Sequence, residues 1–157
     1  GWDAPGDPAQ VQAAFRDWPE PVRKLIAMPD SWRKWALCEA PRDTPWTKGR
    51  TVLIGDAVHG MPPFVAQGAA MAIEDARVLS GVLAAGFGDD IEERLALFAE
   101  ARKARTDKVA AAARRNGFVY HLGGAPAKAR NLGMRLLGAE RLANNMDWIY
   151  GWRPLEG

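Results

Sequence analysis

Residues 49–59 read Gly-Arg-Thr-Val-Leu-Ile-Gly-Asp-Ala-Val-His, and this segment carries the clearest structural signal in the chain. The uninterrupted apolar and β-branched run at residues 51–54 predicts a strand that is buried on both faces of a sheet and ends at Gly55-Asp56. In open α/β folds, ligands bind beyond the carboxyl ends of such strands. An aspartate there can accept hydrogen bonds from two sugar or polyol hydroxyls, and Gly55 lets the backbone approach a ligand closely.

A constrained loop and then a helix are predicted after this strand. The pair Pro62-Pro63 lacks two backbone donors and fixes two φ angles, so residues 60–68 cannot be regular. Apolar spacing predicts a helix over residues 67–85, with N–H groups and a positive dipole near Gly68 that suit an anionic or electron-rich group. Its apolar stripe comprises Met71, Ala72, Ala76, Leu79 and Leu83, with Glu74 and Arg77 off it. An ordinary strand–loop–helix in which Asp56 is only a cap explains this spacing equally well.

Outside this region the sequence predicts helices over residues 7–18, 21–27, 89–117, 127–137 and 140–148, and a strand over residues 32–38. Asp7-Pro8 supplies an N-cap followed by a proline for the first helix, and Gly86-Phe87-Gly88 ends the helix that precedes the longest one. The strand at residues 51–54 has no obvious parallel partner in the chain, although parallel sheets need neighbours and covered faces. The sequence therefore reads as a piece of a larger fold.

The composition excludes several classes of protein. The 157 residues fit one domain, and 21 Lys and Arg against 19 Asp and Glu give a net charge of +2, which weighs against a dedicated nucleic-acid binder. No apolar run approaches the roughly 20 residues that a membrane span needs, and no signal peptide is visible. The one cysteine, Cys38, excludes an intrachain disulfide and a cysteine-built zinc site, and we assign no metal site. The composition predicts a soluble, cytoplasmic, globular chain.

Several conspicuous side chains have a structural interpretation. We expect His59 to be a satisfied structural residue, His121 to be solvated or packed, and Cys38 to be a small packed thiol. Arg102 and Arg105 share a helix face with apolar residues, so we expect them to be buried against carboxylates or carbonyls. The basic run at residues 102–115 is interrupted by acidic residues and predicts a solvated helix face rather than a nucleic-acid site. Most of the seven tryptophans are expected to pack in the core and in interfaces.

Two further segments, Ala66-Gln67-Gly68 and Glu74-Asp75-Ala76, extend the Gly55-Asp56 segment into a longer pattern. This order of strand, Gly-Asp-Ala-Val-His, proline, Ala-Gln-Gly and a helix with Glu-Asp-Ala resembles the second FAD-binding motif of the class A flavin-dependent aromatic hydroxylases, and most of all their salicylate and hydroxybenzoate hydroxylase branch. Residues 34–37, the aromatic-then-two-arginine spacing at residues 98–105, and residues 148–151 add to the likeness, which spans nearly the whole chain. Val58 and Ala70 depart from the usual alanine and polar residue of the family.

The resemblance implies an α/β fold, namely the C-terminal segment of an FAD-binding, Rossmann-like aromatic-hydroxylase fold that is mostly helical with one strand of the FAD-domain sheet. It divides the chain into the end of the substrate-binding part (1–45), the second FAD-binding motif (46–86) and a C-terminal helical region (87–157). The Gly-x-Gly-x-x-Gly fingerprint that holds the ADP part of FAD in this family is absent from the 157 residues. The resemblance therefore implies an N-terminal segment or chain that carries it, separated by truncation, proteolysis or a split gene.

The resemblance also assigns site residues. The carboxylate of Asp56 would accept hydrogen bonds from the flavin ribityl chain, and the amides of Gly68 and Ala69 would face the pyrimidine edge of the flavin. Two residues would act catalytically, with the carbonyl of Pro63 near the reactive flavin face and Gln67 bordering the substrate ring. The full cofactor-binding set would be Gly55, Asp56, Pro63, Gly68, Ala69, Ala70 and Met71.

The implied function is that of an FAD-dependent monooxygenase that hydroxylates an aromatic acid with NADH or NADPH and dioxygen. The protein would position the reactants and exclude water. Two alternatives remain open. A related FAD enzyme without ring hydroxylation, such as an epoxidase or a reductase, would share Gly55-Asp56 and the following helix. A non-catalytic helical partner chain would have lost flavin binding altogether.

Overall fold

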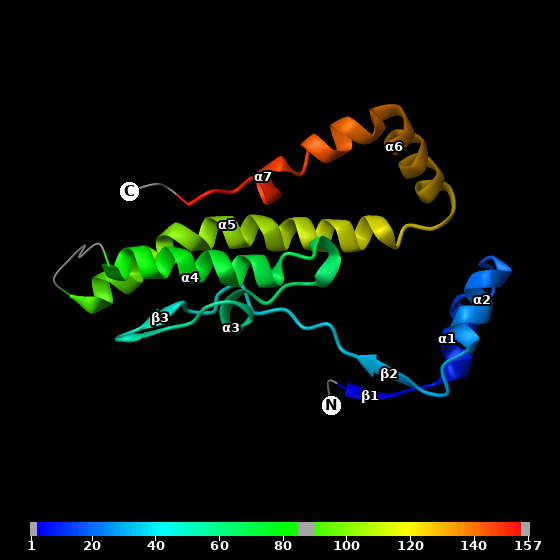
Figure 1. Cartoon of the computed structure of the whole chain (residues 1–157), viewed down its shortest axis with the longest axis horizontal. Coiled ribbons are helices and arrows are strands. Elements are labelled where there is room, and N and C mark those ends of the chain that lie inside the picture. The colour runs from blue at the N-terminus through cyan, green and yellow to red at the C-terminus, as the bar shows by residue number, and fades with distance from the viewer. Residues whose placement is uncertain (1–2, 85–89, 155–157) are drawn as a thin grey trace. The chain divides into compact units, whose positions relative to one another are not determined.

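A computed structural model of the chain describes residues 3–84 and 90–154 (Figure 1). The chain divides into two compact units, residues 1–37 and residues 38–157. Every residue of the predicted site lies in the second unit.

The first unit joins an antiparallel pair of strands to two short helices. Its elements are β1 (Asp3–Gly6), α1 (Pro8–Ala14), α2 (Glu20–Ala27) and β2 (Trp32–Trp35), with β1 paired to β2. Helix α1 begins as predicted, because the Asp7 carboxylate accepts a hydrogen bond from the Ala9 amide at 2.9 Å. It ends before the predicted residue 18, since the chain turns and the Trp18 amide bonds to the Phe15 carbonyl at 3.0 Å. The strand predicted over residues 32–38 is confirmed for residues 32–35. Its partner β1 is not predicted, because it contains a proline and a glycine, which are uncommon in strands.

The strand predicted at residues 51–54 is much shorter than expected. Only Thr51–Val52 form β4, which pairs antiparallel with β3 (Thr47–Lys48) across a turn at Gly49, where φ is 53°. The predicted burial on both faces is wrong, since Thr51 is exposed and Ile54 keeps 41% of its surface accessible. A β-branched run favours an extended backbone, but neighbouring strands decide its burial, and among the described residues β4 pairs only with β3.

The segment after residue 54 contains one element that the sequence pattern does not predict. This is the four-residue helix α3 (Asp56–His59), which is too short to show a helical period. Gly55 precedes it with a φ of 59°, and a Cβ at Gly55 would lie 3.2 Å from the Cβ of Ala72, so the turn requires glycine. The irregular loop that follows holds one 3₁₀ turn, η1 (Pro63–Val65). Helix α4 (Gly68–Ala84) then confirms the prediction, while its predicted stop at residues 86–88 lies outside the described residues.

Helix α5 (Ile91–Tyr120) is the longest helix that the structure describes, and it packs along α4 (Figure 1). Asp90 caps it by accepting a hydrogen bond from the Glu92 amide at 3.1 Å, and the helix continues past its predicted end at residue 117. Apolar side chains from α4, α5 and the loops form the core. One cluster comprises Val65, Met71, Val109, Ala112 and Ala113, and another comprises Trp46, Val58 and Phe98.

A glycine in α5 lets the η1 turn approach that helix closely. A Cβ at Gly117 would lie 2.6 Å from two ring carbons of Phe64, so the aromatic ring occupies the space that a side chain would need. The carbonyl of Phe64 also accepts a hydrogen bond from Nδ2 of Asn116 at 3.3 Å. These contacts hold the proline-containing loop against α5.

After α5, two helical segments are separated close to the predicted break between residues 137 and 140. Helix α6 (Gly124–Asn144) is interrupted at Gly138, where φ is 76° and ψ is 161°, so it consists of two helical pieces close to the predicted ones. A short helix, α7 (Asp147–Tyr150), follows. None of the helices within residues 3–84 and 90–154 is long and apolar enough to cross a bilayer.

Candidate functional site

The carboxylate of Asp56 lies at the start of helix α4. Asp56 is exposed, and a Cβ placed on Gly68 would be 3.7 Å from its Oδ1 atom. Within the described part of the chain this carboxylate makes no hydrogen bond or ion pair, and the residue before α3 is Gly55. Asp56 therefore does not cap a helix, and an acceptor without a partner lies beside the first residue of α4.

The first turn of α4 presents backbone donors at the same place. The first amide of α4 with an acceptor is that of Met71, which donates to the carbonyl of Gln67 just before the helix at 2.9 Å. The amides of Gly68, Ala69 and Ala70 have no acceptor among the described residues. The positive end of the helix dipole adds to their preference for an electron-rich group. One carboxylate and a set of aligned N–H donors can bind a ligand that has both hydroxyls and carbonyl-like acceptors.

The other predicted site residues lie on the loop before α4 or in its first turn. Pro63 is exposed at the start of η1, whereas Gln67 is buried and its Nε2 donates to the Ala66 carbonyl at 3.4 Å. Ala66 itself has a φ of 53°, an uncommon value for a residue with a Cβ. The side chain of Met71 is fully buried in the core cluster with Val109, so only its backbone could contact a ligand.

An open hollow of about 310 Å³ lies beside Asp56. Its lining residues are Cys38, Glu39, Ala40, Pro41, Asp56, Ala57, Gly60 and Met61. Cys38 is exposed here, so the prediction of a packed thiol is wrong, because the chain around it runs over the surface rather than through the core. In residues 3–84 and 90–154 no group of three or more His, Cys, Asp or Glu side chains could hold a metal ion.

A buried carboxylate lies behind the site, on the second turn of α4. Oδ2 of Asp75 accepts a hydrogen bond from the Gly55 amide at 2.9 Å and lies 2.6 Å from Nε2 of His59, while Oδ1 accepts from Nε of Arg102 at 2.7 Å. Burial by itself would raise the pKa of Asp75, but the hydrogen bonds from His59, Gly55 and Arg102 together hold that pKa below its usual value. Asp75 is therefore a buried carboxylate that remains ionised.

The neighbouring carboxylate, Glu74, joins the two arginines of α5. Arg105 binds it through Nε at 2.6 Å and Nη2 at 2.7 Å, and Nη1 of Arg102 lies 2.8 Å from Oε2 of Glu74. Arg105 also donates to the carbonyls of Trp148 and Ile149, both at 3.0 Å. These contacts confirm that Arg102 is buried, and Arg105 largely buried, against carboxylates and carbonyls.

The expectation that Glu74 lies off the core is wrong, whereas the expectation of a solvated basic face on α5 is confirmed in part. Glu74 is only 8% exposed although the apolar stripe of α4 places it off the core, because its partners come from another helix about thirty residues away in the sequence. In the basic run at residues 102–115, Lys103, Lys108 and Arg115 are exposed, as expected, while Arg105 and Arg114 are partly buried. Arg102 is buried, and the ammonium of Lys108 lies 4.2 Å from the centre of the Trp148 ring.

Both histidines make the structural contacts expected of them, but His59 is buried and His121 is exposed. His59 is buried, hydrogen-bonded to Asp75 and packed on the ring of Trp46 with centroids 5.4 Å apart, although its Nδ1 has no partner among the described residues. His121 is exposed, its Nδ1 lies 2.6 Å from the Gly117 carbonyl, and its ring packs edge-on against Phe64.

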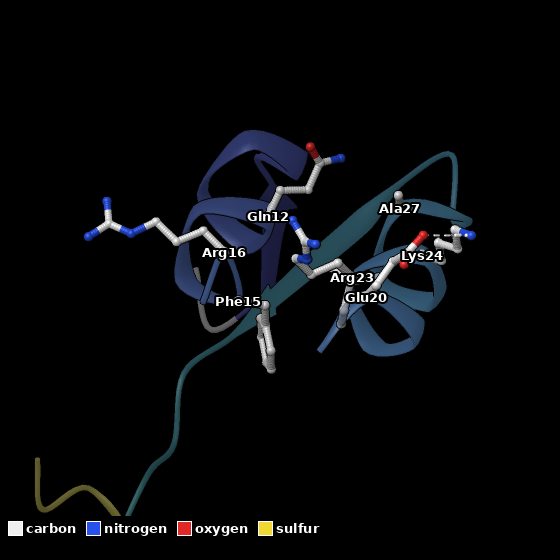
Figure 2. A pocket seen from close by; sticks show the side chains of 8 residues that line it. Gln12, Phe15, Arg16, Glu20, Arg23, Lys24 and Ala27 are labelled. Carbon is white, nitrogen blue, oxygen red and sulfur yellow. Dashed lines mark ion pairs between the residues drawn. The ribbon is translucent and has the colours of Figure 1, made fainter. Parts of the chain in front are cut away.

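A second hollow, of about 430 Å³, lies between α1 and α2 of the first unit (Figure 2). Basic side chains from Arg16, Arg23 and Lys24 surround it, and Lys24 pairs with Glu20 at 2.9 Å. Arg16 extends away from α2 (Figure 2). None of the residues assigned from the sequence lines this hollow, and the exposed ion pair contributes little stability.

Comparison with known proteins identifies the family to which this geometry belongs. A family model described as an FAD binding domain matches residues 12–113, which is more than half of the chain. The chain belongs to this family, that of the class A FAD-dependent aromatic hydroxylases. The resemblance seen in the sequence is thereby confirmed.

Relatives of this hydroxylase-family chain match nearly all of its length. It is 35% identical to 3-hydroxybenzoate 6-hydroxylase 2 of Aquipseudomonas alcaligenes, over 94% of this chain and 46% of that enzyme. It is 37% identical to 3-amino-4-hydroxybenzoate 2-monooxygenase PtnB3 of Streptomyces platensis, over 96% of this chain and 37% of that enzyme. The chain therefore spans less than half the length of the curated relatives it matches.

Solved structures show the same fold. A substrate complex of salicylate hydroxylase matches 97% of this chain and 36% of its own, with a TM-score of 0.78 and 28% identity. Klebsiella pneumoniae HpxO complexed with FAD and uric acid matches 88% of this chain and 36% of its own, with a TM-score of 0.72 and 30% identity. The chain thus has an FAD-binding aromatic-hydroxylase fold that is mostly helical in the part described.

Asp75 belongs to the Glu74-Asp75-Ala76 part of the motif, but the sequence pattern assigns it no role at the site. The signal that could have revealed its role is the pair Glu74-Asp75 inside a largely apolar helix, together with Arg102 and Arg105 on the next helix. Two adjacent acidic and two spaced basic residues on packed helices favour a buried ion network, because charges are rarely buried without partners.

Proposed function

We propose that this chain supplies the second FAD-binding motif of an FAD-dependent monooxygenase that hydroxylates an aromatic acid. The observation that carries the proposal is the partnerless carboxylate of Asp56 beside the first residue of α4, where the amides of Gly68 and Ala69 also lack acceptors. A carboxylate suits the hydroxyls of a ribityl chain, and aligned N–H groups suit the oxygen and nitrogen acceptors of a flavin pyrimidine ring. These residues fit FAD.

In this proposal the loop and the helix start form the protein side of the flavin pocket. Gly55 keeps the turn narrow, Asp56 orients the ribityl chain, and Gly68, Ala69, Ala70 and the backbone of Met71 line the pyrimidine edge. Pro63 and Gln67 lie on the segment that would border the substrate ring and exclude water from it. Bound FAD, reduced by NADH or NADPH, would supply the oxygen chemistry.

The rest of the flavin pocket would come from residues beyond this chain. We propose that a segment or chain with the Gly-x-Gly-x-x-Gly fingerprint completes a Rossmann-like FAD domain, to which residues 46–86 contribute, with residues 1–45 in the substrate-binding part and residues 87–157 as a C-terminal helical region. The exposed apolar side chains of Ile54 and Ile73, next to the motif, support an interface with such a segment. The cytoplasmic location stays a prediction.

An aromatic acid is favoured as the substrate because several relatives are named for hydroxybenzoates and one solved relative is salicylate hydroxylase. A related FAD enzyme without ring hydroxylation and a non-catalytic partner chain are the alternatives. Hydroxylated product formed per nicotinamide oxidised distinguishes the first alternative, and FAD binding by the complete protein distinguishes the second.

The proposal is tested by Asp56→Ala in the complete flavoprotein. Removing a carboxylate that accepts ligand hydrogen bonds costs about 1.5–3 kcal/mol, so FAD affinity is expected to fall roughly ten- to a hundred-fold while the protein stays folded. Fluorescence titration measures the affinity. Asp43→Ala is the control, since it removes an exposed carboxylate that does not line the hollow beside Asp56. Equal FAD affinity in the Asp56 variant and the wild type would refute the role of Asp56.

A further inference from the structure

A single carboxylate oxygen contacts both ends of helix α3. Oδ2 of Asp75 accepts from the amide of Gly55, immediately before the helix, and lies within hydrogen-bond distance of Nε2 of His59, the last residue of the helix. Asp56 is the first residue between these two points. The orientation of the Asp56 side chain therefore depends on a carboxylate that makes no contact with the hollow itself.

Besides these hydrogen bonds, helix α3 is held by packing, since Val58 lies in the core and the His59 ring packs on Trp46. A helix of four residues cannot form on its own, because nucleation of a first turn is unfavourable. The turn that begins α3 also needs the positive φ of Gly55. Because glycine has more conformational freedom than any other residue type, Gly55 can leave this conformation easily when a restraint is lost. Val58 packs in the core, but the Gly55 amide is restrained by Asp75 alone among the described residues.

Asp75 is in turn held in one orientation by Arg102. Nε of Arg102 donates to Oδ1, the oxygen that does not touch α3, and Nη1 lies 2.8 Å from Glu74. The guanidinium group is 5.6 Å from the centre of the Trp152 ring, so the C-terminal segment covers this contact. Each carboxylate oxygen of Asp75 thus has its own set of donors.

We propose that Asp75 is a positioning residue that holds the Gly55–His59 segment so that the Asp56 carboxylate lies beside the first residue of α4. The inference rests on the proposed function, in which that carboxylate binds FAD. Glu74 shares Arg102 with Asp75 and also pairs with Arg105, but it does not touch Gly55 or His59, so it supports the network and leaves α3 unrestrained.

Asp75→Asn tests this because an amide has the shape of a carboxylate and only one acceptor oxygen. Whichever way the amide turns, its NH₂ group faces either Arg102 or the donors of α3. Glu74→Gln is the matched control, since it weakens the same buried network without contacting α3. Chemical unfolding of each variant first establishes its stability, so that FAD binding is compared between folded proteins.

In the complete flavoprotein, Asp75→Asn is expected to lower FAD affinity about tenfold or more, and Glu74→Gln by less than about threefold. Because Asp75 acts through Asp56, its substitution should change affinity less than about threefold in an Asp56→Ala background. An equal loss in both backgrounds, an equal loss in the Glu74 control, or no loss at all would overturn the inference.

Hydrogen exchange at the Gly55 amide gives a readout that does not require FAD. Without the cofactor, exchange at this amide should be at least about tenfold faster in Asp75→Asn and unchanged in Glu74→Gln. Unchanged exchange in Asp75→Asn overturns the positioning role even if FAD binds normally. If the wild type binds no FAD, the proposed function fails, while the exchange rate still decides whether Asp75 restrains the turn.

A second variant covers the case in which Asp75→Asn does not fold. His59→Asn removes the bond at the far end of α3 and leaves the Asp75 carboxylate on the Gly55 amide. FAD affinity is expected to fall about threefold, with no further fall when Asp56→Ala is also present. Wild-type affinity in His59→Asn would overturn the inference.

Discussion

At the scale of single residues, the carboxylate of Asp75 is fully buried and yet remains charged because three donors surround it. Burial penalises a charge, and here the hydrogen bonds of His59, Gly55 and Arg102 exceed that penalty. The group therefore links the ion network to the backbone of the candidate site.

The lowered pKa of Asp75 predicts how stability depends on pH. A carboxyl group whose pKa is lower in the folded state contributes stability above its unfolded pKa, which is near 3.8, and loses it as pH falls through the folded value. The ¹³C resonance of the Asp75 carboxyl group should therefore titrate with a midpoint below 3.8, and the free energy of unfolding should fall below about pH 4. A midpoint above 3.8 would contradict the hydrogen-bonding pattern described.

At the scale of elements, helices α4 and α5 could be predicted because their evidence is local. The apolar spacing of α4 and the N-cap at Asp90 appear in the sequence itself. The burial of residues 51–54 could not be predicted in the same way, since it depends on neighbouring strands. Helix α3 is too short for any period, and both of its ends contact Asp75, a residue of the next α-helix along the chain.

The features of the candidate site also differ in whether local sequence could predict them. Gly55-Asp56 and the glycine at the start of α4 follow a strand-to-helix pattern, so their proximity could be predicted. The burial of Glu74 could not, because a charged residue beside an apolar stripe normally faces solvent, and the partners that reverse this are on α5. The signal for this network lies in the combination of Glu74-Asp75 with Arg102 and Arg105, and it becomes informative only once the two helices are known to pack together.

The contact between η1 and α5 gives a prediction for this pair of elements. In Gly117→Ala the new methyl group would overlap the ring of Phe64, and such overpacking costs about 1–3 kcal/mol, more than the roughly 1 kcal/mol gained in helix propensity. Urea unfolding should show a destabilised protein. Gly133→Ala in α6 is the control, because nothing lies within 4 Å of its new Cβ and a small gain in stability is expected. Stability unchanged in Gly117→Ala would mean that Phe64 moves aside at no cost.

At the scale of the whole molecule, the candidate site is built within the second unit, from one turn, one loop and one helix start. In the proposed function these residues would contact the ribityl and pyrimidine parts of FAD, whereas the 157 residues lack the Gly-x-Gly-x-x-Gly fingerprint that holds the ADP part in this family. The chain also spans less than half the length of its curated relatives. Its affinity for FAD should reflect only the contacts it contains.

The 157-residue chain by itself is therefore expected to bind FAD with a dissociation constant above about 1 µM, because it lacks the residues that would bind the ADP part of FAD. Isothermal titration calorimetry measures this directly. Adding a chain that carries the Gly-x-Gly-x-x-Gly fingerprint should restore tight binding. A submicromolar dissociation constant for the chain alone would show that the second FAD-binding motif is sufficient for tight FAD binding.

The position of Cys38 allows a fluorescent label to be attached to this chain beside the candidate site. Cys38 is the one cysteine in the sequence, it is exposed, and it lines the same hollow as Asp56. A maleimide dye would therefore attach at one defined place next to the candidate site, with no engineered cysteine and no competing thiol. The emission of that dye could follow a ligand as it arrives, and bulky labels could be used to obstruct the hollow on purpose.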